Sequence, residues 1–171
     1  MKELALIFPH QLYQQHPALH PNRPVVLMEE TLFFNQYRFH KQKLVLHRAS
    51  MKAMQQSWVS DGHRVEYIEA RDPLSDIRKA VAQWAHEGLQ QIHYCECSDY
   101  WLEKRLKTAA AKAGIQLVQY PNPNFLNQPD ALNEYFKNRK TYFQTDFYIA
   151  QRKKQGWLLQ EDGKPLGGKW S

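Results

Sequence analysis

Hydrophobic residues in this chain form short apolar runs that alternate with longer stretches of helical periodicity. Apolar runs of the length of buried strands occur at 4–8, 25–28, 65–68, 91–95 and 116–120. Between them, apolar residues recur at steps of three and four, the spacing of one helix face, at 41–60, 72–87 and 99–113. Strands that alternate with helices predict an α/β fold: a doubly wound, five-stranded parallel sheet with helices on both faces.

Glycines and capping residues mark the ends of the predicted helices. Gly62, Gly88 and Gly114 are spaced 26 residues apart, and each closes a helical pattern just before a strand. A glycine in this place adopts the left-handed conformation at low cost. Helix starts are marked by Asp72, with Pro73 at the first helical position, and by Ser98 or Asp99.

The pattern changes after Tyr120. The run "PNPNF" reads as a loop, and two helices are predicted at about 129–137 and 143–155 before the closing run "GKPLGGKWS". We therefore assign residues 1–122 to an α/β domain and residues 123–171 to a helical extension and linker.

Positive charge is concentrated in the predicted extension. The formal net charge is +6, and residues 137–154 contain six Lys or Arg against one Asp, or +5. The candidates for contact with nucleic-acid phosphates are Arg139, Lys140, Arg152 and Lys153. A solvated helix surface is an equally good interpretation, because no base-reading motif accompanies these charges.

The two cysteines favour a structural role. Cys95 and Cys97 are two residues apart, so on one strand they share a face with His93 and their side chains run parallel. That geometry predicts no disulfide. A catalytic thiol needs a partner histidine and a lowered pKa, neither of which the sequence indicates. With no apolar run of membrane-spanning length and no signal-peptide pattern, a cytoplasmic protein is the simplest expectation.

We expect candidate binding residues just after the predicted strands, because ligands of open parallel sheets bind beyond the carboxyl ends of the strands. Glycine is absent before Gly62, so the first turn lacks the loop that holds a dinucleotide pyrophosphate. Glu29 ends the second strand, where a carboxylate can accept hydrogen bonds from a heterocycle; an exposed strand end is the alternative. Several side chains are conceivable metal ligands but match no known ligand spacing: His10, His16 and His20 with Glu29 or Glu30.

Five runs carry a family resemblance: "HKQKL", "SMKAM", "GHRVEYIEARD", "FYIAQRKKQGWLL" and "GKPLGGKW". They resemble the deoxyribodipyrimidine photolyase-related family, the prokaryotic photolyase–cryptochrome group that includes bacterial (6-4) photolyases, from Leu4 to Trp170. The resemblance implies an amino-terminal domain with a five-stranded parallel sheet and a lumazine antenna at its carboxyl edge. It also implies a following helical domain that carries FAD, a four-cysteine 4Fe-4S cluster and most of the DNA contacts.

The resemblance also implies a set of chromophore-binding residues, with departures. Matching or roughly matching positions are Gln11, Leu12, Glu29, His40, Lys43, Leu44 and Asp99. Departures are Pro9-His10 in place of Gly-Asp, Phe33 in place of a second glutamate, and His47 in place of an apolar residue. Phe33 removes a hydrogen-bond acceptor and fills space, which predicts that a lumazine is not held here as in other family members.

Three functions follow as hypotheses. The first is the antenna-type domain of a light-dependent DNA-repair flavoprotein, either an amino-terminal piece or a naturally short relative, without repair activity by itself because FAD lies in the other domain. It predicts exposed apolar residues near the connection to the helical domain that the resemblance implies. These are Trp157, Leu158, Leu159 and Trp170. The second is a stand-alone module that binds nucleic acid through its basic segment without catalysis. The third, a small enzyme of another doubly wound class, lacks a convincing acid–base pair.

Overall fold

The computed structural model describes residues 2–170 and divides into two compact units, one ending at Asn124 and the other beginning at Phe125. We call residues 2–124 the sheet unit and residues 125–170 the C-terminal unit.

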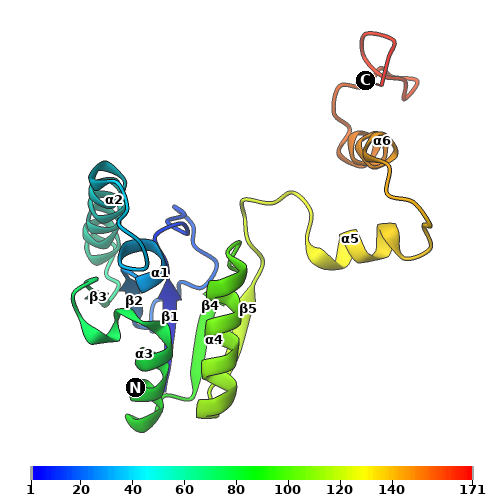
Figure 1. Ribbon diagram of the computed structural model, residues 1–171. Helices are drawn as coiled ribbons and strands as arrows, with labels where there is room; N and C mark the ends of the chain where they lie inside the picture. Colours follow the sequence, from blue (N-terminus) through cyan, green and yellow to red (C-terminus); the bar gives the residue numbers. More distant parts are fainter. Residues whose placement is uncertain (1, 171) are drawn as a thin grey trace. The chain divides into compact units, whose positions relative to one another are not determined.

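Five parallel strands form the centre of the sheet unit (Figure 1). They are β1 (Glu3–Ile7), β2 (Val25–Met28), β3 (Val65–Ile68), β4 (Gln91–Cys95) and β5 (Gln116–Tyr120), in the order β3-β2-β1-β4-β5. The chain moves outward from β1 to one edge and then returns to β4 beside β1, so the strand order reverses between β1 and β4. The predicted doubly wound parallel sheet is confirmed, and its carboxyl edge has a switch point between β1 and β4.

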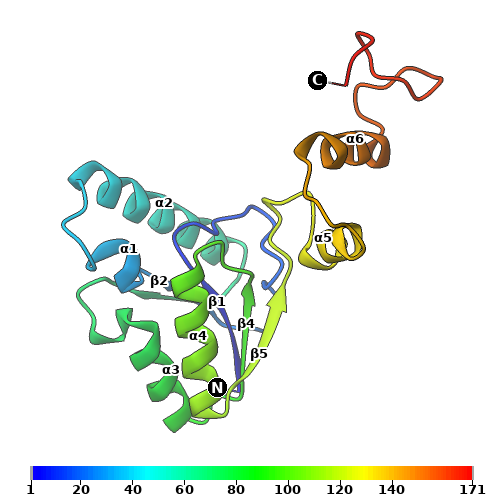
Figure 2. The same ribbon diagram turned by 45° about the vertical axis from the view of Figure 1, so that its right-hand side comes forward.

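Helices cover both faces of this sheet (Figure 2). They are α1 (Thr31–Phe34), α2 (Lys41–Ser60), α3 (Ile77–His86) and α4 (Tyr100–Ala113). Because side chains alternate along a strand, Leu4 and Leu6 of β1 pack in the core beneath α3 and α4, whereas Ala5 and Ile7 pack in the core beneath α2. Gly114 ends α4 with φ of +70°, as its place in the sequence predicted.

One local prediction is corrected, and one short helix was missed. Asp72 and Pro73 begin a single 3₁₀ turn, Pro73–Ser75, rather than a long helix. Asp76 is extended, at φ −84° and ψ 112°, and its carboxylate accepts the amide of Arg78 at 3.0 Å, so α3 begins afresh at Ile77. The short helix α1 was not predicted, because four residues are too few to show a helical period.

The cysteines do not share a face. β4 ends at Cys95, and Cys97 turns into the core beneath α3 and α4, where Tyr94 also packs, whereas Cys95 alternates with Tyr94 and faces the opposite side. Both thiols are buried and free, which confirms that they form no disulfide. Burial raises the pKa of Cys95 to about 12 and that of Cys97 well above its usual value. These are neutral core side chains.

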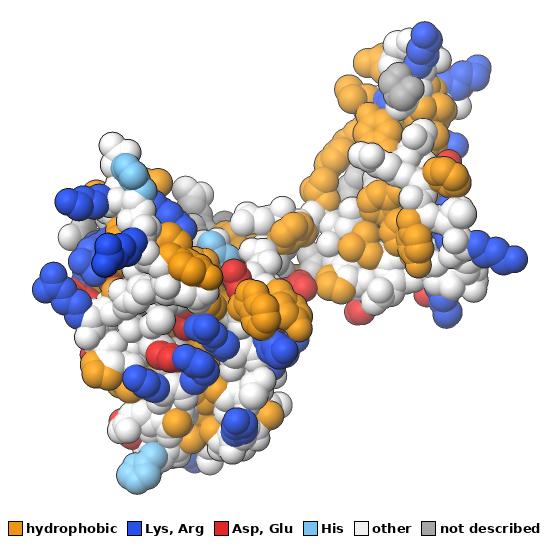
Figure 3. Space-filling view, in the orientation of Figure 1, with side chains coloured by type: hydrophobic (Ala, Val, Ile, Leu, Met, Phe, Trp, Pro, Cys, Tyr) orange, Lys and Arg blue, Asp and Glu red, His pale blue; other side chains and the backbone are white. Residues whose placement is uncertain are grey.

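The C-terminal unit has little core of its own. It contains α5 (Pro129–Phe136) and α6 (Gln144–Gln155), then a loop closed by an antiparallel bridge between Leu159 and Pro165. Within residues 125–170, Arg152 and Pro165 are the only buried side chains. Hydrophobic side chains are prominent on its surface in Figure 3. Trp157 is 49% and Leu158 62% exposed, as predicted, whereas Leu159 and Trp170 are half-buried.

Candidate functional site at the switch point

Gln11 joins the loops that follow β1 and β4. It is fully buried, and its Nε2 donates to the carbonyl oxygens of Cys95 at 3.0 Å and Glu96 at 3.1 Å. Its Oε1 is covered and has no hydrogen-bond partner among the described residues. Gln11 is therefore held in place at the switch point by its Nε2, while its Oε1 remains an unused acceptor.

His10, one residue earlier, lies among aromatic rings. Its ring centroid is 5.0 Å from that of Phe33 and 6.3 Å from that of Phe8. Both ring nitrogens are covered and lack partners within residues 2–170. Burial lowers the pKa of His10 to about 4; nearby Asp99 opposes this and His47 adds to it. His10 is thus neutral at pH 7 and offers one donor and one acceptor.

Phe33 and His47 form an aromatic wall beside His10. Their ring centroids are 6.5 Å apart, and His47 also lies 6.1 Å from Phe34. Burial and the charge of Lys43 lower the pKa of His47. Asp99 is the N-cap of α4, where its Oδ1 accepts the amide of Leu102 at 2.8 Å. The predicted residues that the structure brings together, called the His10 cluster below, are His10, Gln11, Phe33, His47 and Asp99.

Glu29 is placed differently from the sequence-based expectation. It is fully buried, and its carboxylate forms a bidentate pair with Arg48 while accepting Tyr67 Oη at 2.6 Å and the amide of Ala70 at 2.8 Å. Burial acts to raise the pKa of Glu29, but these hydrogen bonds outweigh it and the pKa falls below its usual value. The carboxylate therefore ties β2, β3 and α2 together and has no open lone pair to offer a heterocycle.

The remaining predicted chromophore residues lie around the start of α2 or in the core. His40 is the N-cap of α2, with its Nδ1 accepting the amide of Gln42 at 3.2 Å. Lys43 is exposed, with its Nζ 4.0 Å above the ring centroid of Phe39. Leu12 packs against the core beneath α2. Leu44 lines a separate hollow of about 210 Å³ with Phe34, Asn35, Val45, Arg48, Ala70 and Arg71.

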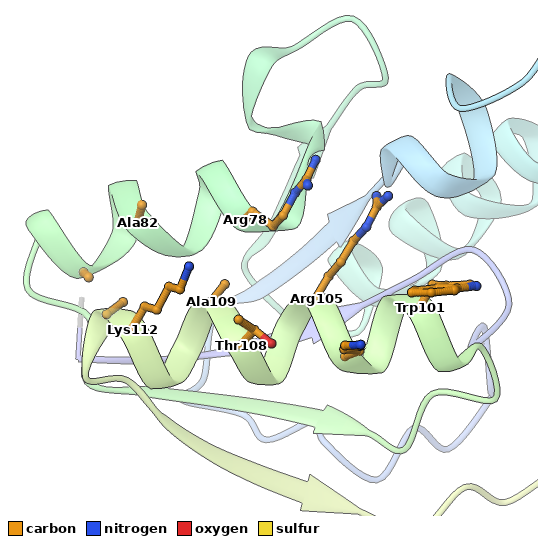
Figure 4. Close-up of a pocket in the computed structure, with 10 residues that line it drawn as sticks. Arg78, Ala82, Trp101, Arg105, Thr108, Ala109 and Lys112 are labelled. Atoms are coloured by element: carbon orange, nitrogen blue, oxygen red, sulfur yellow. The ribbon is translucent and has the colours of Figure 1, made fainter.

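Glu30, considered with the histidines as a possible metal ligand, is a helix cap instead: it is fully buried and caps α1 by accepting the amide of Leu32 at 2.5 Å, and burial raises its pKa. One feature was missed by sequence reasoning. Between α3 and α4 lies a groove of about 680 Å³ lined by several cationic side chains and Trp101 (Figure 4). Its signal in the sequence was the polar face of α4, which residue spacing alone does not distinguish from a solvated surface.

The basic residues of the C-terminal unit have diverse surroundings. Arg152 is buried, and its guanidinium donates to the carbonyl oxygens of Trp157, at 3.2 Å, and Leu158. It is therefore occupied in holding the closing loop. Arg139 lies 4.1 Å above the ring centroid of Tyr135 and 3.8 Å from Asp146. Lys140 and Lys153 are exposed.

The histidines weighed as metal ligands do not converge. His16 is buried and stacked on Tyr13, and burial lowers its pKa to about 4. Across residues 2–170, no three His, Cys, Asp or Glu side chains gather as metal ligands would. In the same stretch, none of the helices has the length and apolar character needed to cross a membrane.

Sequence comparisons identify the relatives of this chain. Residues 5–171 match the family described as deoxyribodipyrimidine photo-lyase-related protein. A protein of Acanthamoeba polyphaga mimivirus, described as uncharacterized protein R852, is 28% identical over 182 residues, covering all of this chain and 91% of that protein. A (6-4) photolyase of Agrobacterium fabrum is 24% identical over 183 residues, and this chain spans 35% of its length. The chain belongs to the deoxyribodipyrimidine photolyase-related family.

Proposed function

We propose that this chain is an antenna-type domain that binds an aromatic heterocyclic chromophore at the His10 cluster. One observation carries the proposal: three covered polar atoms, His10 Nδ1, His10 Nε2 and Gln11 Oε1, lack partners within the described chain at the switch point. Each such atom costs about 1–3 kcal/mol when left unsatisfied. Unmet atoms in the place where this fold binds ligands are best explained by a ligand that satisfies them.

The chemistry of these residues fits a flat heterocycle with its own donor and acceptor. Neutral His10 supplies one donor and one acceptor, and Gln11 supplies a further acceptor. Phe33 and His47 supply rings for stacking. Since the His10 nitrogens are covered, the ligand reaches them by displacing the ring of Phe33 or His47. A bound chromophore would supply light absorption, while these residues orient it and exclude water.

A lumazine held by two carboxylates does not fit this arrangement. Glu29 is fully engaged by Arg48, Tyr67 and Ala70, and the second glutamate expected from the family resemblance is Phe33. We therefore propose a heterocycle held through His10 and Gln11 instead.

The proposed partner is a flavin-containing helical domain, through which the assembly would contact DNA. The exposed apolar side chains of Trp157, Leu158 and Leu166 in the C-terminal unit support a docking role, because a monomer rarely leaves such a patch uncovered. Light-driven repair depends on the flavin, so repair activity is proposed for the assembly and not for this chain by itself.

The test is a binding panel on the full 171-residue chain. Lumazines, flavins and pterins are added in turn, and absorbance shifts and quenching of ligand fluorescence are recorded. We expect one class to bind and expect His10→Leu and Gln11→Leu to weaken it about tenfold or more. A His86→Leu variant, which alters an exposed histidine at the end of α3, serves as the control. No binding by any class, or equal binding by all variants, would remove the antenna role.

A second candidate is a weak nucleic-acid contact through the C-terminal unit. The exposed side chains of Arg139, Lys140 and Lys153 favour it, although Arg152 is committed to its own loop. An electrostatic site of this kind loses affinity steeply with salt. Failure to bind a DNA duplex even at low salt would remove this candidate.

A further inference from the structure

The groove between α3 and α4 has the size of a small-molecule site. Its volume of about 680 Å³ lies within the range of roughly 300–1,000 Å³ typical of ligand pockets. Small side chains line it from both helices: Ala82, Ala85, Thr108, Ala109 and Ala113. The rest of the lining is cationic or aromatic: Arg78, Trp101, Lys104, Arg105 and Lys112. Figure 4 shows Trp101, Arg105 and Lys112 arrayed along α4, with Arg78 on the facing helix.

The helical repeat explains why α4 presents these side chains together. Residues three and four apart lie on one helix face, and the lining residues of α4 follow that spacing from Trp101 to Lys112. This stretch is about 16 Å long at 1.5 Å per residue. Lys107 lies outside the lining and pairs with Glu103 at 2.8 Å. Among the described residues, no Asp or Glu lines the groove.

Three of the four cations lack a counter-ion. Arg78 is already held by Asp76 through contacts of 2.9 and 2.6 Å. Within residues 2–170, Lys104, Arg105 and Lys112 have no carboxylate at salt-bridge distance.

Arg105 also has hydrogen-bonding capacity to spare. Its Nη1 is covered and lacks a partner in the described chain, and its Nη2 makes a long contact of 3.5 Å to Gln36 Oε1. The carboxylates that act on Arg105 at longer range belong to Glu30 and Asp76, which are engaged in helix caps. The groove is therefore electrostatically complementary to an anion. In Figure 3, Lys and Arg side chains gather on the face of the sheet unit that carries α3 and α4.

Trp101 adds a surface for stacking. Its side chain is 60% exposed and meets Tyr100 edge-on, with ring centroids 5.3 Å apart. The Nζ of Lys104 lies 5.5 Å from the Trp101 ring centroid. An exposed indole next to unpaired cations suits a ligand that joins an aromatic ring to negative charge.

We propose that the α3–α4 groove binds a free nucleotide, with its base stacked on Trp101 and its phosphates held by Lys104, Arg105 and Lys112. The volume of the groove matches a small molecule, and the cations follow one another along the same helix face as the indole. This site uses none of the residues of the His10 cluster, so it stands or falls independently of the proposed chromophore site.

The test is calorimetric titration of the full chain with ADP, adenosine and pyrophosphate. We expect ADP to bind at least tenfold more tightly than either fragment, because only ADP reaches both the ring and the cations. The double variant K104Q/K112Q should weaken ADP binding about tenfold or more, since it removes charge-assisted contacts. Trp101→Ala should also weaken it, while Trp101→Phe should retain most of the affinity because a ring remains.

A matched control separates the groove from general charge. K79Q/K107Q also removes two positive charges, but from exposed positions on α3 and α4 outside the lining, and it should leave ADP binding unchanged. Amide chemical shifts of the unaltered chain give a readout that needs no variant, and ADP should move those of 101–112. Absence of ADP binding at millimolar concentration, equal losses in both double variants, shifts confined to other residues, or tighter binding of a thymidine decamer would each overturn the proposal.

Discussion

The guanidinium of Arg48 donates hydrogen bonds to both carboxylate oxygens of Glu29. Glu29 directly follows β2 and is fully buried. Tyr67 and the amide of Ala70 occupy the remaining acceptor positions. The network links three elements of the carboxyl edge: β2, α2 and the segment that follows β3. This network, called the Glu29 brace, stabilises the fold beside the switch point.

Removing Arg48 should therefore destabilise the sheet unit. Arg48→Met leaves a buried carboxylate without its counter-charge, and such changes cost about 3–5 kcal/mol. Because Arg48 itself is partly exposed, we expect about 3 kcal/mol, measured as a lower urea midpoint. Lys41→Met is the control: Lys41 is an exposed cation on the same helix with no salt bridge among the described residues, so its loss should cost under about 1 kcal/mol. Equal effects of the two variants would refute the Glu29 brace.

The buried, unsatisfied nitrogens of His10 should lower the free energy of unfolding of this chain. His10→Leu removes two covered nitrogens that lack partners in the described chain, and replacing unsatisfied polar groups by apolar ones is neutral or stabilising. We expect the free energy of unfolding to rise by about 1 kcal/mol while chromophore binding weakens about tenfold or more. Chemical denaturation measures the first effect and ligand fluorescence the second. A variant that is less stable than the natural chain would contradict this account of the unmet atoms.

Acid should destabilise the fold, and two buried histidines make part of that effect calculable. Burial lowers the pKa of both His10 and His16 from 6.5 to about 4. Between pH 6.5 and pH 4 these two histidines are protonated in the unfolded chain but neutral in the folded chain. Their effect on the free energy of unfolding is therefore absent above pH 6.5, and stability is lost as the pH falls toward 4. From pH 7 to pH 5 each histidine accounts for about 2 kcal/mol.

The His10→Leu variant tests this assignment. Between pH 7 and pH 5 it should lose about 2 kcal/mol less stability than the natural chain, measured by urea denaturation at each pH. An unchanged pH profile would show that other groups govern the acid response.

The loop after α6 should depend on Arg152. Its guanidinium donates to the carbonyl oxygens of Trp157 and Leu158 and stacks 5.3 Å from the Trp170 ring centroid. Arg152→Ala leaves those carbonyls unpaired, so we expect proteolytic cleavage near Trp157 to accelerate several-fold. Lys154→Ala alters an exposed lysine of the same helix and should leave the cleavage rate unchanged. If both variants are cut equally fast, the loop is held by other contacts.

The sequence predicted the sheet well because its signals are local. The bounds of β2 through β5 follow from apolar runs, and Gly62, Gly88 and Gly114 adopt the positive φ values that their positions predicted. The bounds of α2 follow from its repeating apolar face.

Errors arose where the outcome depended on a competing cap or on distant residues. Asp76 competes with Asp72 as a cap, and the end of β4 at Cys95 decides where Cys97 points. The engagement of Glu29 depends on Tyr67, 38 positions along the chain. The α3–α4 groove forms between two neighbouring helices, and the hydrophobic periodicity of the sequence does not predict which helices lie next to each other.

The most direct test of the chromophore site is ¹⁵N NMR of the histidine rings while the chromophore identified in the binding panel is added. We predict that the two ring-nitrogen resonances of His10 shift on binding as they gain hydrogen-bond partners, while those of exposed His86 stay in place. Saturating binding that leaves the His10 resonances unmoved would contradict the account.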